Sequence, residues 1–370
     1  MQMFLDTFNA FGENAWQMPV MWLIGGILIF LAIRYEMEPT LLLPMGFGAI
    51  LVNLPMPEGI EGAVNVIETL YKAGIANELF PLLLFIGIGA MIDFGPLLSN
   101  PKMLLIGAAA QFGIFFTLSM ARLLGFEMID AASIGIIGAA DGPTSIVVAT
   151  QLGTKYKGAI MVAAYSYMAL VPIVQPPFIK LATTKKERLI RMPYNPGSVS
   201  KGLRILFPIC VTIIAALAAP ASSALVGFLM FGNLIRECGV LDSLSTTAQN
   251  ALANLITIFL GITVAFSMKA ADFLQWNTIM ILGLGLVAFI ADTVFGVFFV
   301  KFLNLFTKNK MNPMIGAAGI SAFPMASRVV HKMGLKEDPQ NFLLMHAAGA
   351  NVAGQIASAI VGGLIISLVL

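Results

Sequence analysis

Long apolar runs recur along the whole chain, and they constrain its fold more than any other feature of the sequence. Only 11% of the 370 residues are charged and the mean hydropathy is +0.90, whereas about 25% of the residues of a soluble domain are charged. Several runs approach the roughly 20 apolar residues that a helix needs to cross a bilayer. We therefore expect an all-α polytopic membrane protein, whose apolar runs are 18–33, 40–54, 79–92, 103–118, 203–219, 255–268, 278–299 and 342–370.

A basic segment in the middle of the chain divides it in two. Seven lysines and arginines between Lys180 and Arg204 accompany a single acid, Glu187, so this segment has a net charge of +6 in a chain whose net charge is +2. The positive-inside rule places such a segment on the cytoplasmic side. A signal for topology explains this charge, and a docking surface for a soluble partner is the alternative interpretation. We expect a first membrane repeat over 1–180, a basic cytoplasmic loop over 181–202 and a second membrane repeat over 203–370.

Short motifs recur at nearly constant spacing in the two halves. The tetrapeptide Ile-Gly-Ala-Ala at 137–140 recurs at 315–318, and two further matched pairs are separated by 181 and 174 residues. These collinear matches indicate an internal duplication. We count five complete spans and one broken or re-entrant segment in each half. An odd number of crossings is what an inverted repeat requires, so we expect the two repeats to have opposite orientations.

Glycine and proline interrupt one apolar segment in each half. The first segment, 134–150, is interrupted at 141–145, and the second, 312–330, is interrupted at 319–324. Such residues release backbone groups from the helical ladder, and released groups survive in a bilayer only where protein or a water-filled cavity surrounds them. Paired interruptions at corresponding places are typical of a transporter's ion site. We therefore expect two discontinuous helices that meet at an ion site near the midplane.

Asp141 lies in the first interruption and is the strongest candidate for an ion ligand. A charged side chain at the bilayer centre costs about 2.5–3.5 kcal/mol on insertion scales, so an acid there is a functional candidate by default. A carboxylate in such a place can exchange a proton for a sodium ion, because desolvation and a bound cation shift its charge state in opposite directions. The alternative is that Asp141 only caps the half-helix that begins at Gly142 and Pro143.

The remaining polar residues in apolar segments offer neutral oxygen atoms. Asn312 and Ser321 lie in the second broken segment, Asn351 lies in the final span, and Tyr167 holds the comparable place in the first half. Hard cations prefer oxygen ligands, so these residues are candidates for a sodium site. Each of them also has a simpler interpretation, a hydrogen bond to a neighbouring helix.

Two further charged residues stand out. Asp292 is a second lone acid in an apolar run, which makes it a secondary candidate for an ion site or a proton path. Arg328 lies seven residues after Ser321, where we expect it to project a fixed charge towards a cavity. Such a charge could balance Asp141 or attract an anion.

Three longer motifs carry a resemblance to a known family. They are GAADGPTSI at 138–146, NPMIGAAGISAFPMASRVV at 312–330 and HAAGANVAGQIASA at 346–359. In their order and separation, they resemble the beta subunit of the sodium-transporting carboxylic acid decarboxylases. That family includes the membrane subunits of oxaloacetate, methylmalonyl-CoA, glutaconyl-CoA and malonate decarboxylases, and the resemblance spans essentially the whole chain.

The resemblance implies a reaction and a set of functional residues. The beta subunit of this family decarboxylates carboxybiotin, takes up a proton and exports sodium ions. Matched position by position, the resemblance implies catalytic roles for Asp141, Tyr167, Ser321 and Arg328. It further implies that Arg328 binds the cofactor, and that the sodium ligands are Asp141, Asn312, Gly316, Ser321 and Asn351.

The resemblance also implies partners and a location. The chain has no Met-Lys-Met biotinylation pattern, so the expected cofactors are sodium and carboxybiotin presented by another subunit. The expected partners are a biotin carrier subunit, a carboxyltransferase alpha subunit and small single-span accessory membrane subunits, in a homo-oligomer without nucleic acid. The expected location is the inner membrane of a bacterium, which the chain crosses several times. The alternative function is a stand-alone sodium-coupled carboxylate transporter.

Overall fold

The computed structural model describes residues 16–56, 62–193 and 199–370, and these residues form helices and turns without a β-strand. The expectation of an all-α protein is therefore confirmed for the described part of the chain. The first half contains α2 (Gln17–Tyr35), α3 (Pro39–Val52), α4 (Ala63–Gly74), α5 (Leu79–Met91), α6 (Gly95–Ser99), α7 (Lys102–Ala109), α8 (Phe112–Leu123), α9 (Met128–Gly135), the 3-10 helix η1 (Ile136–Ala139), α10 (Gly142–Gln151) and α11 (Lys157–Ala182).

A short helix, α12 (Lys185–Arg188), lies in the basic segment between the halves. Residues 194–198 of that segment and residues 1–15 of the first half lie outside the described residues. The second half contains α13 (Lys201–Ala218), η2 (Pro220–Ser222), α14 (Ser223–Glu237), α15 (Asp242–Thr247), η3 (Ala248–Leu252), α16 (Ala253–Val264), η4 (Ala265–Met268), α17 (Ala270–Phe273), α18 (Trp276–Phe306), α19 (Met314–Ala317), α20 (Met325–Glu337) and α21 (Leu344–Val369).

The number of long apolar helices is smaller than the number of spans that we expect from the sequence. Within the described residues, 7 helices are long and apolar enough to cross a membrane, and the bent pair α4–α5 could supply an eighth. The sequence predicts five complete spans in each half. The difference arises at elements such as α3, whose 14 residues extend over about 21 Å at 1.5 Å per residue, less than the roughly 30 Å of hydrocarbon.

The helices of the two halves pack in corresponding pairs. If α3 corresponds to α14, α5 to α16, α7 to α18, α10 to α20 and α11 to α21, three contacts between the halves have a counterpart. Thus α3 packs on α16 as α14 packs on α5, α11 packs on α18 as α21 packs on α7, and α20 packs on α11 as α10 packs on α21. The halves therefore interlock rather than form two separate bodies.

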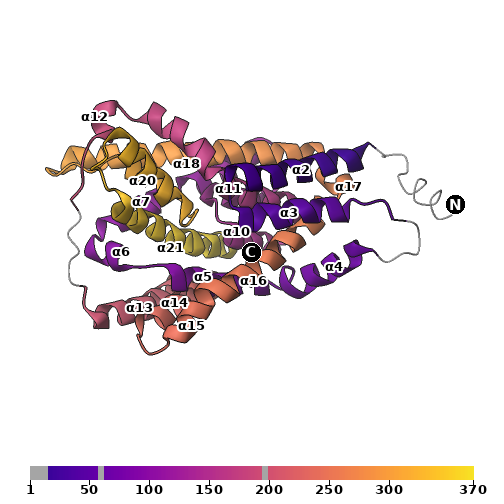
Figure 1. The fold of residues 1–370 in the computed structure, drawn as a ribbon, viewed down its shortest axis with the longest axis horizontal. Coiled ribbons are helices and arrows are strands. Elements are labelled where there is room, and N and C mark those ends of the chain that lie inside the picture. The colour runs from indigo at the N-terminus through magenta and orange to yellow at the C-terminus, as the bar shows by residue number, and fades with distance from the viewer. Residues whose placement is uncertain (1–15, 57–61, 194–198) are drawn as a thin grey trace.

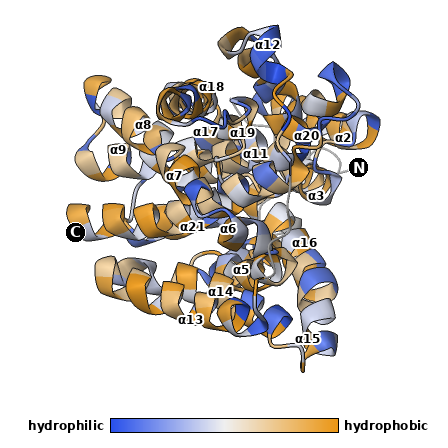
Figure 2. Cartoon of the chain, turned by 90° about the vertical axis from the view of Figure 1, so that its left-hand side faces the viewer, coloured by the Kyte–Doolittle hydropathy of each residue, from blue (hydrophilic) through white to orange (hydrophobic). Residues whose placement is uncertain are grey.

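The apolar surface of the molecule faces outward, as lipid requires. Figure 1 shows most of the long helices running along one direction, with α12 and α20 near one end and α4 and α17 near the other. Figure 2 shows apolar residues over much of α8, α9 and α13, while α12 is hydrophilic. Helix α21 lies inside the molecule, since 61% of the residues in its most apolar stretch are buried, against 11% for α13.

Candidate functional site

The two broken segments meet in the interior of the protein. In the first, η1 ends at Ala139, Ala140 adopts a left-handed conformation with φ of 51°, and α10 begins at Gly142. In the second, α19 ends at Ala317 and helix resumes only at Met325. The backbone amide of Ser321 donates a hydrogen bond of 3.1 Å to the carbonyl of Ala139. Helix is therefore interrupted in both segments, and a backbone hydrogen bond joins the two interruptions.

Asp141 is buried, with only 3% of its surface exposed, and several donors hold its carboxylate. The Oδ2 atom accepts hydrogen bonds from the Thr144 hydroxyl at 2.7 Å, the Gln355 amide at 2.8 Å and the Ser358 hydroxyl at 2.8 Å. The Oδ1 atom accepts a longer bond of 3.4 Å from the backbone amide of Thr144. Asp141 therefore caps α10, as the simpler interpretation predicted, and α21 supplies two further donors.

The sequence did not predict four residues of this cluster: Thr144, Tyr165, Gln355 and Ser358. Gln355 and Ser358 follow Asn351 at intervals of four and three residues, so all three lie on one face of α21. That polar stripe in an apolar helix is the signal that could have identified them. Tyr165 was also missed: its ring lies where a side chain on Gly142 would be, and its buried hydroxyl has no partner among the described residues.

Ser321 and Asn351 lie beside the second interruption, as predicted. The Ser321 hydroxyl donates to the carbonyl of Gly354 at 3.0 Å, and the Asn351 amide donates to the carbonyl of Ile320 at 2.6 Å. The Oδ1 atom of Asn351 is buried and accepts no hydrogen bond within the described part of the chain. Helix α21 therefore contacts both interruptions, through Asn351 at one and through Gln355 at the other.

Five of the predicted residues lie outside this cluster: Tyr167, Asp292, Asn312, Gly316 and Arg328. The Tyr167 hydroxyl donates to the carbonyl of Leu282 in α18. Gly316 packs so tightly against Gly296 of α18 that a Cβ atom on Gly316 would lie 2.0 Å from the Gly296 carbonyl oxygen. Asn312 binds the segment that connects the two halves, as described below. In this structure, Tyr167, Gly316 and Asn312 each contact backbone groups of a neighbouring segment.

Asp292 lies in α18 and is completely buried. Its Oδ1 atom accepts a hydrogen bond of 2.9 Å from the backbone amide of Gly113, near the start of α8, while its Oδ2 atom has no partner among the described residues. A Cβ atom on Gly138 would lie 2.5 Å from the backbone of Gly113. Asp292 therefore binds the backbone of Gly113, and Gly113 in turn packs against Gly138 beside the first interruption.

Arg328 lines a cavity of about 540 Å³ near the end of the molecule that carries α12. Its guanidinium forms no ion pair within the described residues, and it does not reach Asp141. Burial raises the pKa of nearby Glu38, and the positive charge of Arg328 opposes that rise without cancelling it. The other residues that line the cavity are Tyr35, Glu36, Met37, Pro172, Pro176, Lys180, Met325, Val329, Lys332, Met333, Lys336 and Glu337.

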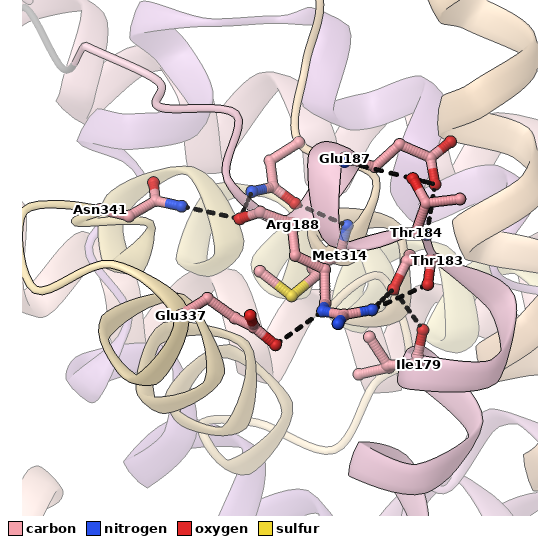
Figure 3. Close-up of polar contacts among 9 residues, drawn as sticks. Ile179, Thr183, Thr184, Glu187, Arg188, Met314, Glu337 and Asn341 are labelled. Carbon is pink, nitrogen blue, oxygen red and sulfur yellow. Dashed lines mark hydrogen bonds and ion pairs between the residues drawn. The ribbon is translucent and has the colours of Figure 1, made fainter.

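The segment 183–192, which we call the strap, runs across the same end of the molecule and is bound to the second half. Figure 3 shows Arg188 at its centre. The Arg188 guanidinium forms an ion pair of 2.7 Å with Glu337 of α20, and both side chains are largely buried, at 14% and 17% exposure. The same guanidinium donates to the carbonyl of Thr183 at 2.8 Å.

Asn312 holds the strap at its carbonyl groups. Its amide donates at 2.9 Å to the carbonyls of both Arg188 and Ile190, and its Oδ1 atom accepts from the backbone amide of Met314. Asn341 donates to the Arg188 carbonyl as well, at 3.0 Å. The strap is therefore fastened to both ends of the α19–α20 region, and all the polar atoms of the Asn312 side chain are used in this way.

Comparisons with known proteins agree with the motifs. The profile of the family described as the Na+-transporting oxaloacetate decarboxylase beta subunit matches residues 17–369. The chain is 52% identical to the methylmalonyl-CoA decarboxylase subunit beta of Veillonella parvula, over 94% of this chain and 92% of that protein. It is 51% identical to the glutaconyl-CoA decarboxylase subunit beta of Acidaminococcus fermentans, over 98% and 96%. It is 44% identical to the oxaloacetate decarboxylase beta chain of Klebsiella pneumoniae, over 95% of each chain.

These relatives confirm the resemblance that the three motifs indicated, and they cover nearly the whole length of the chain. A beta subunit is one component of a complex with further subunits. The apolar helices agree with a protein that crosses a membrane several times. The chain belongs to the family of the Na+-transporting oxaloacetate decarboxylase beta subunits, and it is a membrane subunit of a sodium-transporting decarboxylase.

Proposed function

We propose that this chain decarboxylates carboxybiotin, which a partner carrier subunit presents, and couples that reaction to proton uptake and sodium export. The observation that carries this proposal is the position of Asp141. A buried acid lies where two interrupted helices touch, surrounded by hydroxyl, amide and carbonyl groups. This is the arrangement by which transporters bind a cation near the midplane.

The groups around Asp141 fit a sodium ion. Sodium requires oxygen ligands with little excess charge, and the cluster offers one carboxylate with the hydroxyls of Thr144 and Ser358. Ser321 and Asn351 supply neutral oxygens at the second interruption, including the Asn351 Oδ1 atom that has no protein partner in the described residues. We assign sodium binding to Asp141, Ser321 and Asn351. Gly316 and Asn312 bind neighbouring backbone in this structure, so a sodium-binding role for either residue requires a rearrangement that releases it from these contacts.

The cavity beside Arg328 suits carboxybiotin. Its walls combine methionine and proline side chains with four cations, Lys180, Arg328, Lys332 and Lys336. The apolar walls suit the fused rings of biotin, and a guanidinium without an ion pair suits the carboxylate. In the reaction, the bond between the carboxyl carbon and the ureido nitrogen breaks, its electrons stay on nitrogen, and nitrogen takes up a proton as carbon dioxide leaves. Arg328 orients the carboxylate before this step.

Coupling requires that the sodium site open to each side of the membrane in turn. Moving one charge against 100 mV costs about 2.3 kcal/mol. The corresponding contacts between the two halves, such as α3 on α16 and α14 on α5, support an inverted repeat in which each half rocks against the other. The strap, which we place on the cytoplasmic side because of its positive charge, lies at the same end as the Arg328 cavity.

The comparisons favour a complex that acts on an acyl-CoA thioester. Relatives named for methylmalonyl-CoA and glutaconyl-CoA are 49–52% identical to this chain, whereas those named for oxaloacetate are 44–45% identical. We therefore propose a bacterial inner-membrane complex that contains a carboxyltransferase alpha subunit, a biotin carrier subunit and small accessory membrane subunits.

The decisive experiment is decarboxylation of free carboxybiotin by the purified complex in detergent and in proteoliposomes. We expect carbon dioxide release that depends on sodium and, in vesicles, sodium uptake. When the acyl-CoA substrate drives the reaction instead, avidin should block sodium uptake because it captures the carrier. A stand-alone carboxylate transporter would instead move sodium with a carboxylate, without biotin and regardless of avidin. That second result would overturn the proposal.

A further inference from the structure

The cations at the strap end of the molecule fall into two groups. Three of them are paired: Arg188 with Glu337, Arg191 with Asp338 and Lys301 with Glu187. A second group is exposed and forms no ion pair within the described residues: Lys185 and Lys186 of α12, and Lys332 and Lys336 of α20. We call this second group the cationic rim. Acidic side chains of the same protein neutralise the first group, whereas the lysines of the rim are exposed and have no acidic partner among the described residues.

The rim adjoins the cavity that holds Arg328. Arg328, Lys332 and Lys336 follow one another at intervals of four residues, so they form a stripe along one face of α20, and all three line the cavity. Helix α12 packs on α20, so Lys185 and Lys186 lie on an element that neighbours the stripe, and Figure 2 shows that α12 is hydrophilic. Lys332 and Lys336 therefore belong both to the rim and to the wall of the cavity.

A stripe of like charges is unfavourable in the isolated subunit. Like charges four residues apart on a helix repel one another, and the nearest acid of α20, Glu337, is already bound to Arg188. Neither burial nor pairing inside the described chain compensates this repulsion. An external anionic partner would compensate it.

We propose that the cationic rim is the docking surface for an acidic face of the carrier subunit that delivers carboxybiotin. This inference rests on the proposed function, because the carrier must stand close enough for its biotinyl arm to reach Arg328. Positive charges around a cavity mouth accelerate the encounter with an acidic protein and orient it, and they act more on the association rate than on the chemistry. The contacts of Arg188 with Glu337 and of Asn312 with the strap hold α12, which is part of the strap, beside α20.

The test compares two reactions of the purified complex. Decarboxylation of the acyl-CoA substrate needs the carrier to dock, whereas decarboxylation of added free carboxybiotin does not. For Lys185→Glu with Lys186→Glu, which lie outside the cavity, we expect substrate-driven turnover to fall on the order of ten-fold and the reaction of free carboxybiotin to stay unchanged. Lys185→Gln with Lys186→Gln should give a smaller fall. Raising the salt concentration should slow only the substrate-driven reaction of the wild type.

The matched control is Lys201→Glu with Lys308→Glu, two exposed lysines that do not line the cavity. This control should keep both reactions. Equal turnover in the rim and control variants would overturn the inference, and so would a loss of both reactions together. If the effect instead follows the anionic lipid content of the vesicles, the rim binds membrane rather than carrier. A wild type that does not react with free carboxybiotin would contradict the proposed function itself.

Discussion

The backbone amide of Ser321 donates a hydrogen bond of 3.1 Å to the carbonyl of Ala139, which joins residues 182 positions apart in the chain. Neither group has a helical partner at these breaks, so each satisfies the other in a place where water is scarce. Movement of either half against the other must break or replace this bond. The contact therefore links the geometry of the ion site to the relative position of the two halves.

Replacement of Asp141 by asparagine should abolish sodium-coupled turnover. The Oδ2 atom accepts three hydrogen bonds, and asparagine would remove the negative charge that a cation needs while it preserves the size of the side chain. Insertion and assembly should be retained, because removal of a buried charge lowers the cost of membrane insertion. Blue native electrophoresis checks assembly, and sodium uptake into vesicles checks transport. A variant that pumps at the wild-type rate would show that Asp141 is only a cap.

Ser358→Ala should raise the sodium concentration for half-maximal rate. The Ser358 hydroxyl binds the Oδ2 atom of Asp141 at 2.8 Å, and a hydrogen bond to a charged group contributes about 1.5–3 kcal/mol, so we expect a change of about ten-fold or more. Ser367→Ala is a matched control in the same helix, since the Ser367 hydroxyl binds only the Gly363 carbonyl. Sodium titration of the decarboxylation rate gives the measurement, and equal values for the two variants would contradict this role.

Asn312→Ala should lower stability more than it alters sodium dependence. The amide of Asn312 binds two carbonyls of the strap. Asn341 still binds the Arg188 carbonyl when Asn312 is replaced, but the Ile190 carbonyl loses this donor, and leaving an acceptor unpaired costs about 1–3 kcal/mol. We expect a lower thermal midpoint for the detergent-solubilised subunit, with the half-maximal sodium concentration close to that of the wild type. Ser321→Ala should show the opposite pattern. An increase in that sodium concentration without loss of stability would instead identify Asn312 as an ion ligand.

Two substitutions of Asp292 separate its possible roles. If Asp292 acts by accepting the hydrogen bond of the Gly113 amide, Asp292→Asn keeps an acceptor and should retain turnover, whereas Asp292→Ala should lose several-fold because it leaves that amide unpaired. The ratio of sodium ions to carbon dioxide should stay the same in the asparagine variant. Complete loss of coupling in Asp292→Asn would show that its carboxyl takes part in ion or proton transfer.

Glu38→Gln should stabilise the protein at neutral pH. Burial raises the pKa of Glu38 in the folded state, so the folded protein takes up a proton more readily than the unfolded chain. The stability that this proton supplies is present in acid and is lost as pH rises through the folded-state pKa. Glutamine is neutral throughout, so its advantage in thermal midpoint should vanish in acid. A difference that is independent of pH would assign the effect to packing.

The sequence predicts the fold class and the centre of the site because those depend on local patterns. Apolar runs specify helices, and the glycine and proline residues beside Asp141 and Ser321 specify where helices stop. The partners of Asp141 depend on tertiary packing. Gln355 and Ser358 lie more than 200 positions away in the chain, and only their helical spacing on α21 points to a common face.

The sequence is less informative about the role of a residue whose side chain suits two different kinds of contact. Asn312 suits a cation as well as it suits a pair of backbone carbonyls, and the fold uses it for the second purpose. Fewer helices are long enough to span a membrane than the sequence predicts, because we counted short apolar runs, such as the one at 40–54 that forms α3, as complete spans. These outcomes depend on how neighbouring elements pack, which a single run of residues does not encode.

The strap also has a consequence for how the chain could be divided. It lies in the segment that connects the two halves, and residues of the second half form ion pairs with it and bind its carbonyl groups. The segment that precedes residues 194–198 is therefore fastened to the second half by non-covalent bonds as well as by the peptide chain. Fragments 1–193 and 199–370, produced together as separate polypeptides, should associate in the membrane, because the contacts of the strap with the second half do not depend on the peptide connection.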